Sequence, residues 1–176
     1  MTQVTSERTV LDEREVSGKF LEFFYPIHYR LGMALEDALR SGQLTRKQVA
    51  ILWLIRSEGE NGRTMRRKDI LQLITTWFEV SSSAITKALR AMARPPLHLL
   101  EVVEDPRSGR EKLVILTEKG EQFLLTMVDH GSQFLWEIVK RLTSEEIRYG
   151  VQFLQQATRA LDQIRHEQPA SGKAKK

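Results

Sequence analysis

The sequence predicts a mainly α-helical protein with one small β-hairpin. Through most of the 176 residues, apolar side chains recur at steps of three and four residues, which is the period of an α-helix. Two short runs of β-like composition, residues 100–103 and 112–116, break this pattern, and the turn-forming residues between them predict a hairpin. The chain contains no cysteine, so its core must form without disulfide bonds or a cysteine-based zinc site.

The N-terminal segment predicts an arm followed by a long helix. Residues 1–15 are polar and acidic, and we expect a flexible arm there and no signal peptide. A helix is expected over residues 16–42, with Pro26 kinking or delaying it and Ser41-Gly42 ending it. Its apolar positions at helical spacing are Phe20, Phe24, Ile27, Leu31, Leu35 and Ala38.

Three helices are expected next. Thr45 and Gln48 have the spacing of a capping box, and they predict a helix that stops in the loop at residues 58–62. A shorter helix is expected from Met65 or Arg66 to Ile74. The next helix has Ser81 as its expected N-cap and ends before Pro95-Pro96.

Two long helices are expected after the hairpin, over residues 117–166. Thr117 is expected to start the first of them. A second capping box, Thr143 to Glu146, predicts the start of the last helix. The remaining residues, 167–176, are polar and basic, and we expect a disordered tail.

This order of elements predicts a winged helix-turn-helix, because three helices followed by a hairpin form that motif. We expect the winged helix-turn-helix over residues 43–116, with dimerisation helices on both sides of it, at 16–42 and 117–166. The first helix is apolar on a broader front than the outer helix of a monomer needs, since residues 20–25 are almost continuously apolar.

The helix before the hairpin carries a polar arc whose charged residues are all positive. Ser82, Ser83, Thr86, Lys87, Arg90 and Arg94 share this arc, and no Asp or Glu lies between Ser81 and Arg94. Hydroxyl groups and cations of this kind can bond phosphates and base edges in DNA. The alternative is an ordinary amphipathic helix with its polar side in water, for which a mixture of charge signs is expected.

The hairpin tip is also cationic. Arg107 and Arg110 flank the turn, with Lys112 just behind them, and Gly109 is expected to supply the tight turn. Asp105 is interpreted either as a partner that holds one of the arginines or as a simple turn former. Residues 62–112 hold ten Lys and Arg against six Asp and Glu, a net charge of +4, which suggests a localised anionic partner unless these charges only solvate the surface.

The stretch DPRSGREKLVILTEKG, residues 105–120, resembles the wing of the MarR family of bacterial and archaeal transcription regulators. That wing typically reads D-x-R-x-x-R followed by L-T-x-x-G, and the matching residues are Asp105, Arg107, Arg110, Leu116, Thr117 and Gly120. The earlier stretch LTRKQVAILWLI, residues 44–55, is similar to the second helix of the family. The resemblance covers residues 20–165.

The resemblance implies a homodimer whose first and last helices interlace, each chain presenting one winged helix to a half-site of pseudo-palindromic double-stranded DNA. Such proteins are usually repressors, often released by small anionic or phenolic ligands. The positions that the resemblance assigns to DNA contact are Ser82, Ser83, Thr86, Lys87 and Arg90 in the recognition helix and Arg107 and Arg110 in the wing. Lys112 is expected to join the wing contacts because it lies just behind the tip.

Two segments depart from the family pattern. The link at residues 75–80 is longer than the usual short turn, and its Trp77 and Phe78 are expected to plug the core instead of contacting a ligand. The segment RPPLHLLEVV replaces the usual short entry to the wing.

Classes of function other than DNA-binding regulation have less support in the sequence. The sequence has no phosphate-binding loop or hydrolase motif, and its four histidines are scattered, so we expect no enzyme, no metal site and no cofactor. A winged helix for protein–protein contact and a non-specific architectural DNA-binding protein stay open as alternatives. No apolar run approaches the roughly 20 residues of a membrane span, and a cytoplasmic protein is the default expectation.

Overall fold

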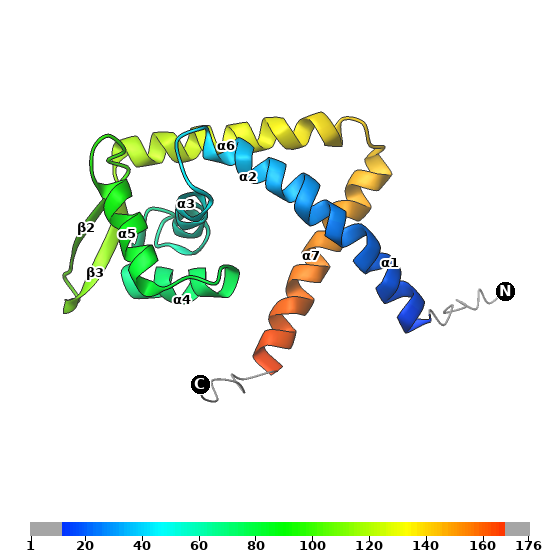
Figure 1. Cartoon of the computed structure of the whole chain (residues 1–176), viewed down its shortest axis with the longest axis horizontal. Helices are drawn as coiled ribbons and strands as arrows, with labels where there is room; N and C mark the ends of the chain where they lie inside the picture. Colours follow the sequence, from blue (N-terminus) through cyan, green and yellow to red (C-terminus); the bar gives the residue numbers. More distant parts are fainter. Residues whose placement is uncertain (1–11, 168–176) are drawn as a thin grey trace, which may run out of the picture. The chain divides into compact units, whose positions relative to one another are not determined.

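The computed structural model describes residues 12–167, and the chain divides into two compact units. The first unit ends at Ser132 and the second begins at Gln133. The first unit contains the winged helix-turn-helix, which confirms the expected fold class, and Figure 1 shows its helices α3, α4 and α5 grouped with the β2–β3 hairpin. No helix among the described residues is both long and apolar enough to span a membrane.

The N-terminal helical segment has three parts: α1 (Glu13–Pro26), a π-helical turn (Ile27–Gly32) and α2 (Met33–Arg40). Asp12 caps α1 by accepting from the Arg14 N–H, so the helix starts before the expected boundary at residue 16. The α-helix gives way to the π turn directly after Pro26, whose ring nitrogen cannot donate a backbone hydrogen bond. Left-handed Ser41 ends α2 as expected, with φ of 51°.

The helix α3 (Arg46–Glu58) is the centre of the winged helix-turn-helix. The predicted capping box is confirmed: the Gln48 N–H donates to Thr45 Oγ1, and Gln48 Oε1 accepts from the Thr45 N–H. Most of the middle of α3 is buried, including Ile51, Leu52 and Ile55. The other two helices of the motif, α4 (Arg67–Trp77) and α5 (Ser82–Ala93), pack against it.

A three-stranded antiparallel sheet, in the order β1-β3-β2, completes this domain. Its strands are β1 (Thr64–Arg66), β2 (Leu100–Asp105) and β3 (Ser108–Leu116). The hairpin was predicted, but β1 was not. Residues 64–66 pair with the distant residues 113–115, so a helix beginning at Met65 or Arg66 was wrong, and α4 starts at Arg67.

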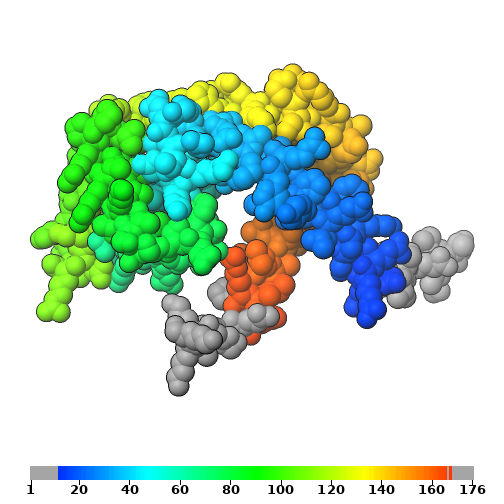
Figure 2. Space-filling view, viewed as in Figure 1, coloured from blue at the N-terminus to red at the C-terminus, as the bar shows by residue number. Residues whose placement is uncertain are grey.

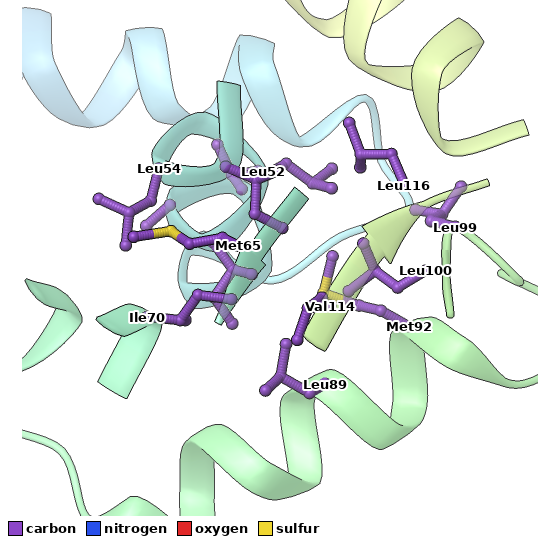
Figure 3. Packing of buried hydrophobic residues seen from close by; sticks show 14 of the residues in the cluster. Leu52, Leu54, Met65, Ile70, Leu89, Met92, Leu99, Leu100, Val114 and Leu116 are labelled. Atoms are coloured by element: carbon purple, nitrogen blue, oxygen red, sulfur yellow. The ribbon is translucent and has the colours of Figure 1, made fainter. Parts of the chain in front are cut away.

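The hydrophobic core lies between the three helices and the sheet. Figure 3 shows Leu89 and Met92 of α5 beside Val114 of β3, and Leu52 and Ile70 of the other two helices near Met65 of β1. Of the two aromatic residues near the end of α4, Phe78 packs against this core, as expected. Trp77 does not, because its side chain is 46% exposed, and the prediction that it plugs the core was wrong.

The last two helices are α6 (Glu118–Val139), which begins in the first unit and ends in the second, and α7 (Ser144–Glu167) in the second unit. The predicted capping box before α7 is confirmed, since the Thr143 N–H donates to Glu146 Oε2 and the Glu146 N–H donates to Thr143 Oγ1. The helix α7 includes Glu167, so a tail starting at that residue was wrong by one position. Residues 168–176 and most of the N-terminal arm lie outside the described residues.

The start of α6 is held tightly against the segment that leads into β2. Thr117 Oγ1 donates to the His98 carbonyl oxygen and accepts from the Gly120 N–H, while the Thr117 N–H donates to the Leu99 carbonyl oxygen. A Cβ atom on Gly120 would overlap that Leu99 oxygen. Glycine is therefore required where α6 meets the entry to the wing.

We expect Gly120→Ala to lower the free energy of unfolding by about 1–3 kcal/mol or more, because the Leu99 backbone has to shift to admit the methyl group. Gly109→Ala is the control. Gly109 has no atom within 4 Å of an added Cβ and no positive φ, so the change should stay within about 0.5 kcal/mol. Urea denaturation of both variants measures the difference, and equal stabilities would contradict the tight contact at Gly120.

Candidate nucleic-acid interface

The helix α5 turns its apolar side into the core. Ile85 and Met92 are fully buried, and Leu89 is almost so. Ser81 caps the helix, with its hydroxyl accepting from the Ala84 N–H at 3.3 Å, as the sequence predicted. At the other end, the Met92 carbonyl oxygen accepts from the Leu99 N–H at 2.7 Å. The rotation of α5 about its axis is therefore determined by packing.

The predicted polar arc of α5 is the side that remains in solvent. Ser82, Ser83, Lys87 and Arg90 are exposed, and Thr86 is half-buried. Thr86 Oγ1 donates to the Ser82 carbonyl oxygen at 2.8 Å, which leaves the hydroxyl oxygen able to accept a further hydrogen bond. The structure therefore brings all five predicted recognition-helix residues to one accessible surface.

The wing is the β2–β3 hairpin, and it lies next to α5 (Figure 1). Figure 2 shows the hairpin tip projecting from the surface of the first unit. The turn is made by Pro106 and Arg107, because Asp105 and Ser108 are already paired across the strands. Gly109 lies within β3 without a positive φ, so the expectation that it supplies the tight turn was wrong.

Asp105 is the buried anchor of the wing, with only 3% of its surface exposed. Its Oδ1 atom accepts from the Arg107 N–H at 2.9 Å, and its Oδ2 atom pairs with Arg66 Nε at 3.0 Å. The hydrogen bond from the Arg107 backbone, helped by the charge of Arg66, holds the pKa of Asp105 below its ordinary value although burial opposes this.

These contacts correct the prediction for Asp105 in one respect. The carboxylate does hold Arg107, but through the backbone N–H, and the guanidinium that it pairs with belongs to Arg66 on β1. Sequence reasoning missed Arg66, because the strand that carries it was read as the start of a helix. The paired residues stand 39 positions apart, and no local pattern connects them.

The three cations of the wing differ in their partners. Arg107 Nη2 lies 3.2 Å from Glu60 Oε1, and Lys112 Nζ lies 2.9 Å from Glu104 Oε1. The hydrogen bond and the charge of Lys112 lower the pKa of Glu104. Arg110 is exposed and has no ion pair within residues 12–167. Sequence reasoning also missed Glu60, whose loop gave no sign of reaching the wing.

The geometry suits an extended anionic partner better than a small ligand enclosed in a site. Cations and hydroxyls line the exposed side of α5, and further cations lie on the adjacent hairpin. Within the described part of the chain, no three His, Cys, Asp or Glu side chains lie close enough together to hold a metal ion.

Comparison with known proteins agrees with this geometry. Residues 44–120 match the family model described as a winged helix DNA-binding domain. This range of residues contains α5 and the whole wing. A comparison with curated protein sequences found no match.

Several solved structures share the fold. Transcriptional regulator Tm0710 from Thermotoga maritima has a TM-score of 0.61 at 20% identity, over 86% of this chain and 99% of that one. AbsC, a MarR family transcriptional regulator from Streptomyces coelicolor, has a TM-score of 0.61 at 20% identity, over 86% of this chain and 97% of that one. A mutant MarR from E. coli, complexed with operator DNA, has a TM-score of 0.59 at 18% identity, over 84% and 99%.

We expect Asp105→Asn to loosen the wing, because asparagine keeps the size of the side chain but loses the charge that pairs with Arg66. Hydrogen exchange of the Arg107 amide, corrected for its intrinsic rate, should become faster. The exposed neighbouring change Glu104→Gln is the control, and it should leave that amide protected. Equal protection in both variants would contradict the anchoring role of Asp105.

Acid should loosen the wild-type wing in the same way. A carboxyl group whose pKa is depressed by folding stabilises the folded state above its unfolded pKa, about 3.9 for aspartate. That contribution is lost as the pH falls through the lower folded value. Protection of the Arg107 amide in wild type should therefore persist near neutral pH and decline below about pH 4, whereas Asp105→Asn should show no such dependence.

Proposed function

We propose that this chain, which has the winged helix-turn-helix fold of MarR-family transcriptional regulators, is a sequence-specific regulator that binds double-stranded DNA as a homodimer. The observation that carries the proposal is the exposed polar arc of α5. It holds Lys87 and Arg90 together with serine and threonine hydroxyls, and it contains no carboxylate. A surface that only needs solvation has no reason to exclude acidic side chains, whereas one that approaches DNA does.

In this proposal α5 reads base edges in the major groove. Lysine and arginine can pair with guanine O6 and N7, and the half-buried Thr86 can offer its methyl group or hydroxyl to a neighbouring base. Ser82 and Ser83 lie in the first turn of α5, where free backbone N–H groups favour a phosphate. The small serine side chains allow that close approach.

The wing in this proposal contributes affinity more than sequence preference. Arg107, Arg110 and Lys112 lie on a hairpin beside the recognition helix, where they can contact phosphates or enter a minor groove of strongly negative potential. Their charges act on any DNA sequence. The buried anchor at Asp105 holds the tip on which Arg107 is carried.

The homodimer is supported by apolar side chains that each unit leaves in solvent. In α1 these are Phe20, Leu21, Phe23, Phe24 and Tyr25, with 48–68% of their surfaces exposed. In the second unit, Trp136 is 59% exposed and Leu154 is 63% exposed. Apolar surface of this extent usually marks an interface, and a second copy of the chain is the partner that the resemblance to MarR regulators implies.

Repression and release by a small ligand complete the proposal. Their support is the shared fold with MarR-family regulators, one of which was solved with operator DNA. A dimer bound across an operator can block other proteins from the same DNA, and a ligand that separates or reorients the two winged helices would lift that block.

We expect the protein to sediment at about twice the 20.4 kDa of one chain at micromolar concentration. Phe23→Asp should shift the mass toward one chain, because Phe23 is 66% exposed and a charge there disturbs an interface without disturbing the core. Phe23→Leu is the matched control and should stay dimeric. A single-chain mass for the wild type would contradict the dimer.

We expect selection from a random duplex pool to return inverted half-sites about 10 base pairs apart, centre to centre, because a two-fold dimer presents two recognition helices. Lys87→Ala and Arg90→Ala should each cost ~1–3 kcal/mol on the selected site and less on random DNA, if the side chain makes a bidentate base contact. Arg110→Ala should weaken both DNAs by similar factors and flatten the salt dependence by about one unit of log–log slope.

Binding isotherms on both DNAs at several salt concentrations measure these effects. Loss of sequence preference in Arg110→Ala, with preference intact in Lys87→Ala and Arg90→Ala, would reverse the assigned roles. Equal binding of selected and random DNA by the wild type would favour a non-specific architectural protein, and no binding at low salt would favour a protein–protein module.

A further inference from the structure

We propose that Glu60 attenuates DNA binding by the wing, because its carboxylate competes with DNA for the Arg107 guanidinium. On this view Arg110 makes the first wing contact with DNA, and Arg107 joins only by giving up Glu60. The inference rests on the proposed DNA-binding function and assigns unequal roles to two arginines that the sequence motif treats alike.

The contact between the two side chains joins segments that are far apart in the sequence. Arg107 Nη2 lies 3.2 Å from Glu60 Oε1 and 3.5 Å from Glu60 Oε2, and the residues stand 47 positions apart. The carboxylate therefore occupies one of the donor groups that a phosphate oxygen could use and places a negative charge beside the guanidinium. Because both groups are more than half exposed, DNA can reach the pair and exchange with it.

Glu60 lies in a loop that is closed by two backbone hydrogen bonds. The Glu60 N–H donates to the Thr64 carbonyl oxygen at 2.7 Å, and the Thr64 N–H donates back to Glu60 at 3.2 Å. Asn61 and Gly62 both have positive φ in the tight turn between them. A Cβ atom on Gly59 would meet the carbonyl oxygens of Ile55 and Thr64, so that position accepts only glycine without rearrangement.

The Arg107 end is fixed independently of Glu60. The Arg107 backbone N–H donates to Asp105, and Asp105 in turn pairs with Arg66 on β1. Two fixed backbones therefore present the carboxylate and the guanidinium to each other, which reduces the conformational entropy that an exposed ion pair normally costs.

Arg110 provides the contrast within the same hairpin. It follows Gly109 on β3, is exposed, and has no carboxylate partner within the part of the chain that the structure describes. A phosphate that approaches Arg110 meets a guanidinium without a carboxylate partner, whereas one that approaches Arg107 meets a guanidinium whose charge is partly neutralised and is repelled by the Glu60 carboxylate.

The size of the effect follows from the exposure of the pair. Exposed ion pairs stabilise by less than about 1 kcal/mol, so Glu60 attenuates DNA binding and does not prevent it. The expected reduction in affinity is about two- to fivefold.

The test is a double-mutant cycle in the full-length chain. Glu60→Gln keeps the shape of the side chain and removes its charge. Glu58→Gln, two residues away, removes the same charge as a control for general electrostatics, because Glu58 forms no ion pair within residues 12–167. Affinity for the duplex recovered by selection is measured by fluorescence anisotropy at fixed salt, for each variant with and without Arg107→Ala.

We expect Glu60→Gln to bind about two- to fivefold more tightly than wild type, and Glu58→Gln to gain less. The gain should disappear when Arg107 is replaced by alanine, and Arg107→Ala should cost more in the Glu60→Gln background than in wild type. A gain equal to that of Glu58→Gln, an unchanged gain without Arg107, or weaker binding by Glu60→Gln would each overturn the role of Glu60.

Failure of this inference is distinguishable from failure of the proposed function. Wild-type protein that binds no duplex would overturn both. Wild-type protein that binds DNA, with equal affinities for the two glutamine variants, would overturn only the competition by Glu60. Circular dichroism of each variant checks that the fold is retained.

Discussion

Burial of one side of α5 is the constraint on which the arrangement of the candidate DNA-binding surface depends. Ile85, Leu89 and Met92 fill the space above the sheet, and their packing leaves only one rotation of the helix about its axis. The same packing places Lys87 and Arg90 in solvent. The core and the candidate interface are therefore two sides of one helix, and changes that loosen the core also misplace the cations.

The distribution of carboxylates separates the two parts of this surface. The polar arc of α5 contains no carboxylate, so no acidic neighbour on the arc reduces the positive charge that it presents to a partner. In the wing, by contrast, Asp105 is enclosed beneath the turn, Glu60 engages Arg107, and Glu104 engages Lys112. The positive charge of the wing is thus partly neutralised, and the anionic residues of the wing determine how much of that charge is available to a partner.

Local chemistry made much of the fold predictable. Helix caps at Thr45, Ser81 and Thr143 follow from hydrogen bonds over three residues, and the apolar side of α5 follows from the helical period. The strand and the side-chain partners that sequence reasoning missed depend on distant pairings. The strand β1 exists because β3 accepts it, and the partners of Asp105 and Arg107 come from segments 39 and 47 positions away. The DNA-contacting roles of the side chains in α5 and the wing remain predictions.

In the π turn after Pro26, residues 27–32, the number of residues matters as much as their identity, because it determines the direction in which α1 presents its side chains. A turn closed by i→i+5 hydrogen bonds holds an extra residue compared with an α-helical turn, so it shifts the rotational phase of the helix on one side relative to the other. Deleting one residue there would turn the aromatic side of α1 by about 100° relative to α2, which packs against α3. Relatives of this protein with different lengths in this segment would therefore present their N-terminal aromatic residues in different directions.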